Sequence, residues 1–356
     1  MPRPELSVVV CTRNGEHRLA GVLSCLGRQS LDQSRYEVIV VDDGSEDQTA
    51  AVARSFGAHV VTLRPSRGLA AARNAGAEAA AADIIAFTDD DCEPAPDWLE
   101  SLAAAFTRGS PDGVSGQVVA RCENPWLLRY LESRNPVAPM SLDVLRSAGA
   151  GARLRRYLRS VSGVGELLQD GAELYSVVGA NMALRRELIF ELGGFDEAID
   201  FGGEEEELCR RAHARPGGAL FRYEPAAVVA HRFEPQVRDT LRRARGYGRG
   251  HPHSARVHRD VKLIVYPFPA AIAVVGLGLL ARRRRSALAL LAMAPMAVYA
   301  RWPRQAWQAR SAGPLAYAYL QLGEEIATML GELEGLRARD HAGAKSAGGS
   351  MVGSRL

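Results

Sequence analysis

The sequence predicts an α/β fold in which a doubly wound, mostly parallel sheet carries helices on both faces. Short runs of β-branched residues alternate with stretches of helical periodicity, and this alternation is typical of parallel sheets. Several of the predicted strands are directly followed by polar or acidic residues, where such sheets bind their ligands. The 356 residues, 47% of them hydrophobic, suffice for one large domain with an appended segment or for two domains.

The individual elements follow from the spacing of the apolar residues. Continuous apolar runs predict buried strands, and apolar residues three or four apart predict helices. The expected strands are 6–10, 37–41, 60–63, 84–87 and 226–230, and the expected helices are 15–29, 48–56, 68–80, 96–106, 187–192 and 204–214. Residues 133–172 show no clear period, and we expect a mobile excursion there with some helix near 154–161.

The bulk composition limits the classes of function. A net charge of +3 is too small to indicate nucleic-acid binding, and no recognition motif supports it, so we expect no nucleic-acid partner. The five cysteines are odd in number, widely spaced and without a CxxC pair, which favours reduced thiols in a cytosolic compartment. The first apolar run is too short for a signal peptide, so the N-terminal domain is expected to face the cytosol.

Polar and acidic residues follow three of the predicted strands. They are residues 12–14, 42–44 and 89–91. Because the carboxyl ends of parallel strands meet at one edge of the sheet, these groups should converge there. This edge is therefore expected to be strongly acidic.

The run Asp89-Asp90-Asp91 sets three adjacent carboxylates between a buried strand and two prolines. Such charges repel one another, and a hard divalent cation such as Mg²⁺ or Mn²⁺ removes that cost by binding carboxylate and phosphate oxygens. We therefore favour a metal site over a solvated run of charges. Successive side chains of an ideal strand point to opposite faces, so Asp89 and Asp91 can share an ion only if a turn begins there.

A series of segments in one order resembles the family 2 glycosyltransferases, which have the GT-A fold. The segments are LSVVVCTRN, VIVVDDGSEDQT, RGLAAARNAG, AFTDDDCEPAPDWL, VVGANMALRRELIFELGGFDE, GGEEEELCRRA and AVVAH. They extend from about Leu6 to His231, roughly two thirds of the chain. The resemblance implies transfer of a sugar from a nucleotide-diphosphate donor, with a UDP-sugar expected, to an acceptor hydroxyl. It also implies inversion at the anomeric carbon and a Mg²⁺ or Mn²⁺ cofactor.

The resemblance also implies which residues hold the metal. The TDDD segment matches the family's DxD motif, so Asp89 and Asp91 are the expected ligands, with Asp91 in direct contact. Asp89 and Asp90 would contact the metal, the ribose or the sugar. His231 matches a family histidine that reaches the metal or diphosphate, although a lone histidine at a strand end is more often structural. The ion would bridge the two phosphates and stabilise the departing diphosphate.

The nucleotide pocket is expected at the first two strand ends. Asp43 matches the carboxylate that binds the base, although a plain turn with a helix cap would explain it equally. Thr12, Arg13 and Asn14 lie at the base-binding strand end. Arg73, in AARNAG, matches a position near the diphosphate, whereas an arginine on a helix is more often solvated or paired with an acid.

An inverting transfer needs a carboxylate that takes the acceptor's proton. In the resembled family this base is the Asp of an ED pair after a GGFDE stretch, and here Glu205 takes that position. Glutamate reaches one methylene further, and small displacements of a catalytic group are costly. Glu204 and Glu206 therefore remain alternatives, and the glutamate run could also only complement a helix dipole.

The C-terminal part is predicted to be helical and membrane-associated. Residues 263–281 carry no charge, close to the ~20 residues of a spanning helix, and a shorter apolar run at 286–300 follows four arginines. These arginines oppose a spanning hairpin, so an interfacial hairpin, a soluble helical cap and an oligomer interface stay open. The expected division is a catalytic domain at 1–231, a basic amphipathic juxtamembrane segment at 232–262, an apolar helical region at 263–335 and a disordered tail at 336–356.

The basic segment would be attracted to anionic lipids, which places the protein at the cytoplasmic face of the cell membrane. The acceptor would then be a glycan or lipid of the cell envelope. Two other functions stay open. A nucleotidyltransferase would need a basic, glycine-rich phosphate loop, which CTRNGEH is not, and a non-catalytic nucleotide-sugar-binding scaffold is conceivable because glutamate replaces the usual aspartate. An oxidoreductase is disfavoured because no GxGxxG follows the first strand.

Overall fold

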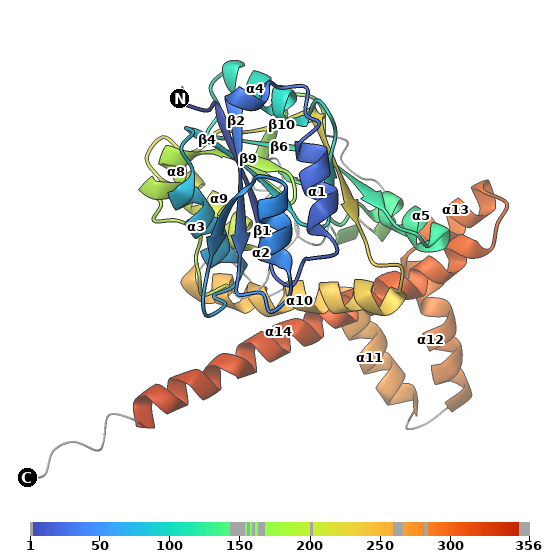
Figure 1. Cartoon of the computed structure of the whole chain (residues 1–356). Coiled ribbons are helices and arrows are strands. Elements are labelled where there is room, and N and C mark those ends of the chain that lie inside the picture. Colours follow the sequence, from blue (N-terminus) through green and yellow to red (C-terminus); the bar gives the residue numbers. More distant parts are fainter. Residues whose placement is uncertain are drawn as a thin grey trace, which may run out of the picture. The chain divides into compact units, whose positions relative to one another are not determined.

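The computed structural model describes residues 3–142, 154, 157–158, 161–162, 168–199, 202–258, 266–280 and 284–348. The chain divides into two compact units (Figure 1). The first comprises Met1–Ala152 and Glu166–Pro235, and the second comprises Arg153–Gly165 and Gln236–Leu356. A segment between two strands of the first unit therefore packs with the second.

The first unit is built on a ten-stranded sheet with the order β3-β2-β1-β4-β9-β6-β10-β8-β7, and β5 pairs with β10. Strands β1, β2, β3 and β4 are parallel, whereas β9 runs antiparallel between β4 and β6. The strands are β1 (Leu6–Thr12), β2 (Tyr36–Asp42), β3 (His59–Thr62), β4 (Ile84–Asp89), β5 (Cys92–Pro94), β6 (Gly113–Arg121), β7 (Met140–Ser141), β8 (Glu173–Ser176), β9 (Met182–Arg185) and β10 (Phe221–Arg232).

Helices cover both faces of this sheet (Figure 1). They are α1 (Leu19–Leu26), α2 (Thr49–Ser55), α3 (Leu69–Ala79), α4 (Trp98–Thr107), α5 (Pro125–Arg134), α8 (Arg186–Glu191) and α9 (Glu204–Ala214), with a 3₁₀ turn η1 (Gln33–Arg35). Along β1, Val8 and Val10 pack with α1 and α4, whereas Val9 and Cys11 pack with α3, α8 and α9. This alternation is what a central strand buried on both faces requires, and the predicted fold class is confirmed.

The strands that sequence patterns missed are those without a long apolar run. Strand β6 (GVSGQVVAR) mixes small and polar residues, and β5, β8 and β9 have only three or four residues. Strand β10 begins at Phe221 instead of 226, because the pairing with β6 continues across a bulge around Pro225. Of the expected excursion at 133–172, residues 143–153 and most of 154–167 lie outside the described residues, so its mobility remains a prediction.

The second unit is helical. It contains α10 (Val237–Val257), α11 (Pro267–Leu280), α12 (Arg284–Val298), α13 (Arg301–Gln308), the 3₁₀ turn η2 (Gly313–Ala316) and α14 (Tyr317–Gly348). Helix α14 continues to Gly348, which differs from the disordered tail expected from residue 336. None of the helices in the described ranges is both long and apolar enough to cross a membrane.

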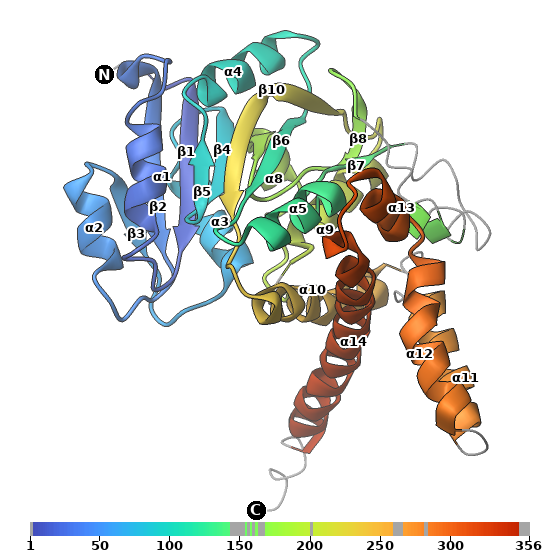
Figure 2. The ribbon, with the colours of Figure 1, turned by 90° about the vertical axis from the view of Figure 1, so that its right-hand side faces the viewer.

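Helices α10 and α14 pack closely against each other (Figure 2). A Cβ atom added to Gly248 would lie 2.1 Å from the main-chain oxygen of Thr328, and one added to Gly331 would lie 2.0 Å from that of Arg245. The two main chains are therefore in direct contact, and only glycine fits at these two positions.

Candidate active site

The register of the sheet brings the predicted residues to one edge. Thr12 pairs with Asp42 across β1 and β2, and Cys11 pairs with Asp89 across β1 and β4. Because these strands are parallel, the segments that follow them leave the sheet at the same edge. The three polar groups expected to converge do so.

A cluster of potential metal ligands lies at this edge. One donor atom from each of Asp89, Asp91, Cys92 and His231 lies within 4.8 Å of the others. Residues 90 and 91 form a turn between β4 and β5, so Asp89 and Asp91 can face the same point despite strand alternation. His231 reaches the cluster because β10 pairs with β5, which sets it opposite Cys92. Its Nε2 atom lies 3.5 Å from Oδ1 of Asp91.

The chemistry of this cluster suits a divalent cation. Burial raises the pKa of the Asp89 carboxyl above its ordinary value, and the nearby Arg73 offsets this only in part. A bound cation would supply the missing positive charge. Two carboxylates and an imidazole are donors suited to Mn²⁺, and the carboxylates suit Mg²⁺ as well. The thiol of Cys92 was not foreseen from the sequence.

Asp90 is engaged within the protein. Its carboxylate accepts hydrogen bonds from Oγ1 of Thr12 at 2.6 Å and from Nε and Nη2 of Arg18 at 3.1 and 2.9 Å. Two of the predicted nucleotide-binding residues, Thr12 and Asp90, are thus bonded to each other. A direct contact of either one with a ligand stays a prediction, and Arg18 was not anticipated.

Asp43 holds the loop that precedes α3. Its buried carboxylate accepts hydrogen bonds from Oγ of Ser66 at 2.7 Å and from the main-chain N–H groups of Arg67 and Gly68 at 2.7 and 2.9 Å. These three bonds fix the conformation of the loop before α3, where the nucleotide pocket is expected. Binding of the base by Asp43 remains a prediction.

The neighbouring loop after β1 is tied down in a similar way. Asn14 has a φ of 49°, its Oδ1 accepts a hydrogen bond from the main chain of Glu46, and its N–H donates to Ser45. Asn14 therefore links the loops that follow β1 and β2. Arg13 beside it is exposed, which leaves its guanidinium accessible to a ligand.

Arg73 joins the metal cluster to the predicted base. Its side chain is only 3% exposed, and its Nη1 forms an ion pair with Glu204. Nη2 lies 3.7 Å from Oδ1 of Asp89, and Nη1 lies 4.0 Å from Oε2 of Glu205. Three acids therefore share the guanidinium of Arg73. From the sequence, such pairing with an acid was the alternative to a position near the diphosphate.

Glu205 is an unusual carboxyl group. Burial and the charge of Glu204 raise its pKa to about 8, although Arg73 acts in the opposite direction. Its Oε2 is buried without a hydrogen-bond partner, while the side chain as a whole is 19% exposed. A carboxylate whose pKa lies near neutrality is well suited to general-base chemistry.

Comparison with known proteins identifies the family. The sequence model of glycosyl transferase family 2 matches residues 7–192, more than half of the chain. The chain belongs to this family. A pre-mycofactocin glycosyltransferase from Mycobacterium tuberculosis is 32% identical over 258 residues, which cover 69% of this chain and 48% of that protein. The chain thus spans about half the length of that relative.

Two further comparisons agree with this assignment. A glucosyl-dolichyl phosphate glucuronosyltransferase from Haloferax volcanii is 28% identical over 241 residues, covering 64% of this chain and 69% of that protein. A mannosyltransferase from Pyrobaculum calidifontis, solved with GDP-Man and Mn²⁺, superposes with a TM-score of 0.60 at 20% identity over 94% of this chain and 88% of that one. The structural likeness shows the shared GT-A fold.

In this family 2 glycosyltransferase, Asn74 positions the segment that leads to α9. Its Oδ1 accepts a hydrogen bond from the main-chain N–H of Phe195 at 2.7 Å, and its Nδ2 donates to the carbonyl of the same residue at 3.0 Å. A Cβ at Gly194 would lie 2.6 Å from Asn74 Oδ1, so only glycine allows this approach. Asn74 was missed because its partner lies 121 residues further along the chain.

Asn181 is structural. It is fully buried, accepts a hydrogen bond from the indole N–H of Trp98 at 2.8 Å, and donates to the carbonyls of Gln117 and Ala227. It thereby connects α4 with β6 and β10. Trp98 belongs to the core, as the sequence indicated.

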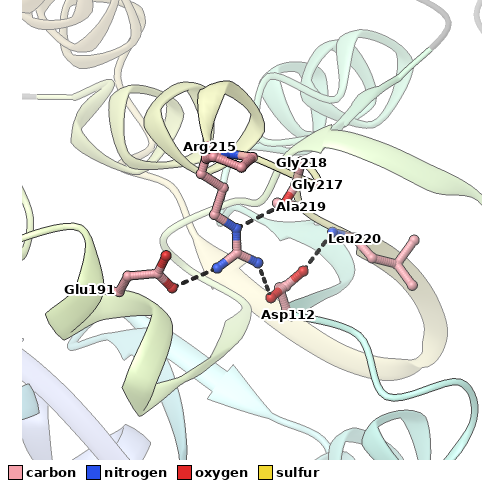
Figure 3. Close-up of a pocket in the computed structure, with 8 residues that line it drawn as sticks. Asp112, Glu191, Arg215, Gly217, Gly218, Ala219 and Leu220 are labelled. Atoms are coloured by element: carbon pink, nitrogen blue, oxygen red, sulfur yellow. Dashed lines mark hydrogen bonds and ion pairs between the residues drawn. The ribbon is translucent and has the colours of Figure 1, made fainter.

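A separate cavity of about 470 Å³ lies in the first unit where β6 and β10 begin (Figure 3). Because both strands run parallel to β4, this is the sheet edge opposite the metal cluster. Arg215 dominates it and bonds to Asp112, Glu191 and the carbonyl of Gly218. These charges satisfy one another, and Arg215 thereby ties the end of α9 to α8 and to the residue that precedes β6.

Proposed function

We propose that the protein is an inverting, metal-dependent glycosyltransferase that moves a sugar from a nucleotide-diphosphate donor to an acceptor hydroxyl. The observation that carries this proposal is the joining of the Asp89, Asp91 and His231 cluster to the carboxylate of Glu205 through Arg73. A site for a diphosphate-binding cation and a group able to accept a proton then lie on either side of one buried arginine.

The cation would be held by Asp89, Asp91 and His231, and when bound it would stabilise the negative charge on the departing diphosphate. The carboxylate of Glu205 would take the proton of the acceptor hydroxyl. As that oxygen bonds to the anomeric carbon from one face, the bond from this carbon to the diphosphate breaks on the other. The configuration of the sugar is thereby inverted.

For the donor we propose a UDP-sugar, as the sequence resemblance implies, and for the acceptor a glycan or a lipid-linked molecule. The relative from Haloferax volcanii, which is named for a dolichyl phosphate substrate, supports the lipid-linked alternative. The structural neighbour was solved with a GDP-sugar and Mn²⁺, so guanine donors belong in every test.

Calorimetry of nucleoside diphosphate binding tests the metal site. UDP and GDP are titrated with and without Mn²⁺ into the wild-type protein and into the Asp89→Ala, Asp91→Ala double variant. We expect Mn²⁺ to strengthen binding of one nucleotide by at least about tenfold in the wild type, about 1.4 kcal/mol, and not in the double variant. Asp97→Ala is the matched control, since Asp97 is an exposed acid of the same segment.

Equal enhancement by Mn²⁺ in the wild type and the double variant would remove the basis of the proposal. Turnover of UDP- and GDP-sugars with an acceptor extract tests the reaction itself. Binding without turnover of any donor would favour a nucleotide-sugar-binding scaffold. Diphosphate release from nucleoside triphosphates would favour a nucleotidyltransferase.

We also propose that the second unit attaches the protein to the cytoplasmic face of an anionic membrane. Apolar side chains of α11, α12 and α13 are exposed, among them Val274, Leu288, Met293 and Trp307, the last at 87%. Helix α10 adds arginines, each contributing about 1 kcal/mol near an anionic surface. Exposed apolar groups beside basic ones are typical of interfacial helices.

Sedimentation of the full chain with vesicles tests this attachment. We expect pelleting with phosphatidylglycerol-containing vesicles and less with pure phosphatidylcholine. The triple variant Val274→Ser, Leu288→Ser, Met293→Ser should reduce pelleting, whereas Phe56→Ser, an exposed apolar residue of the first unit, should not. A wild-type protein that stays in the supernatant with both vesicles would refute membrane attachment.

A further inference from the structure

We propose that Glu204 is a positioning residue that, through its ion pair with Arg73, holds this arginine away from Glu205 and so preserves Glu205 as an effective base. This inference rests on the proposed function of the same site. It assigns different tasks to the two neighbouring glutamates, which the sequence left as alternatives.

The geometry fixes Arg73 in one place. Its guanidinium packs against Gly179, where an added Cβ would lie 2.2 Å from Nη2, and its carbon Cζ lies 5.7 Å from the centre of the Phe195 ring. Glu204 contacts Nη1 directly, whereas Oε2 of Glu205 stays 4.0 Å away. Arg73 is therefore paired directly with Glu204, whereas its electrostatic interaction with Glu205 acts over a longer distance.

The burial of the two glutamates separates their roles. Glu204 is 2% exposed, so its bonded carboxylate has little access to an acceptor hydroxyl. The side chain of Glu205 is 19% exposed, although its Oε2 atom, like Oε2 of Glu204, is buried without a hydrogen-bond partner. Of the pair, Glu205 is the group that can meet a substrate.

The surrounding charges support the same division. Glu205 is faced by Glu204 on its own helix and by Arg73 from α3. Of the other acids in this first turn of α9, Glu206 lies 3.6 Å from Arg210, and Glu207 pairs with Arg211. Loss of the Glu204 charge would remove its repulsion of the Glu205 carboxylate and leave the Arg73 guanidinium to Glu205 and to Asp89, which lies 3.7 Å away. Both changes would lower the pKa of Glu205.

The first test measures the charge of Glu205 without any reaction. Protein labelled with ¹³C at the glutamate carboxyl carbon is titrated by NMR, and Glu205→Gln identifies the Glu205 signal by its loss. In Glu204→Gln we expect the midpoint of this signal to fall by about one pH unit or more. Glu206→Gln, which removes a charge from the same turn, should shift it much less.

The second test follows kcat/KM for donor and acceptor against pH in the same variants. Because the base must be deprotonated, activity rises with pH, and in Glu204→Gln this rise should move to lower pH by the same amount. The plateau should fall because a less basic carboxylate accepts a proton less readily, while KM for the donor stays unchanged. Glu204→Asp, which keeps the charge, should retain the wild-type profile more closely.

The outcomes separate this inference from the proposed function. An unshifted NMR midpoint in Glu204→Gln overturns the inference whether or not turnover is found. A folded Glu204→Gln protein without activity at any pH, beside an active Glu205→Gln protein, would make Glu204 the base and also overturn it. If the wild type turns over no donor, the proposed function fails, while the titration still decides how Glu204 and Arg73 control Glu205.

Discussion

Both compact units of the protein bury glutamates, and two of these, Glu204 and Glu325, have partners of opposite kinds. Glu204 of the first unit pairs with the cation Arg73. Glu325 of the second unit is equally buried, but it accepts hydrogen bonds from the hydroxyls of Tyr157 at 2.6 Å and Tyr299 at 2.8 Å. One carboxylate is held by a charge and the other by neutral donors.

This difference indicates which buried carboxyl groups can take part in a reaction. Gln321 extends the network around Glu325, since it donates to this carboxylate at 3.2 Å and accepts from the indole of Trp302 at 2.9 Å. These polar groups bond to one another, which is typical of a structural network. Around Arg73, by contrast, three acids share one cation, and the pKa values of Asp89 and Glu205 are raised.

The largest expected effect is on catalysis. Glu205→Gln should lower turnover by at least about 100-fold, because the carboxamide of glutamine cannot take the proton of the acceptor hydroxyl. Glu325→Gln is the control from the second unit and should keep most of the turnover. Steady-state rates with the best donor measure both, and more than a tenth of the wild-type rate in Glu205→Gln would contradict a catalytic role for Glu205.

Removal of the shared cation should destabilise the first unit. Arg73→Met leaves Glu204 buried without its partner, which costs about 3–5 kcal/mol, and Glu204→Gln in the same chain should recover part of that loss. Native-state hydrogen exchange in peptides of α3 and α9 measures this separately from the second unit. Arg67→Met, which breaks an exposed pair with Glu197, should change little. Similar exchange in Arg73→Met and Arg67→Met would show that Arg73 does not stabilise the first unit.

Loss of one neutral donor should cost less. Tyr299→Phe removes a single hydrogen bond to Glu325, and we expect about 1.5–3 kcal/mol in the exchange of α14 peptides. Ile326→Ala, at the next position of the same helix with an exposed side chain, serves as the control. If Tyr299→Phe lowered the stability more than Arg73→Met does, the neutral donors would matter more to Glu325 than the cation does to Glu204, which is the opposite of our expectation.

A further effect is the pH dependence of stability. The folded pKa of Glu205 is raised to about 8 from an ordinary 4.5, so the folded state binds the proton more tightly than the unfolded state does. The stabilisation by this proton is complete below about pH 4.5 and is lost as pH rises through about 8. Melting temperatures at pH 5 to 9 should therefore fall less steeply in Glu205→Gln. Parallel slopes would mean that Glu205 titrates normally.

The sequence predicted the parallel half of the sheet because β1, β2 and β4 are continuous apolar runs with sharp polar ends. The same ends located Asp89 and Asp91, and the motif order added His231, which the structure brings to them. Strands β6 and β9 escaped prediction because their residues are stabilised by neighbouring strands more than by their own periodicity.

The ion pairs of the two site arginines could not be predicted from the sequence, for one physical reason. Arg18 meets Asp90 across 72 positions, and Arg73 meets Glu204 across 131. An isolated arginine in a helix gives no local signal of its distant partner, because the partner is chosen by how the helices dock on the sheet. The sequence pattern could therefore name Arg73 but not the acids with which it pairs, and it missed Arg18.

The contact between α10 and α14 has a mechanical consequence. Where the two backbones touch at Gly248 and Gly331, the ridges and grooves that side chains normally provide are absent, and each carbonyl fits a hollow in the other helix. Axial sliding would drive these oxygens into the flanking side chains, so the helices must first separate before they can shift. We therefore expect helices α10 and α14 to move together as one rigid body.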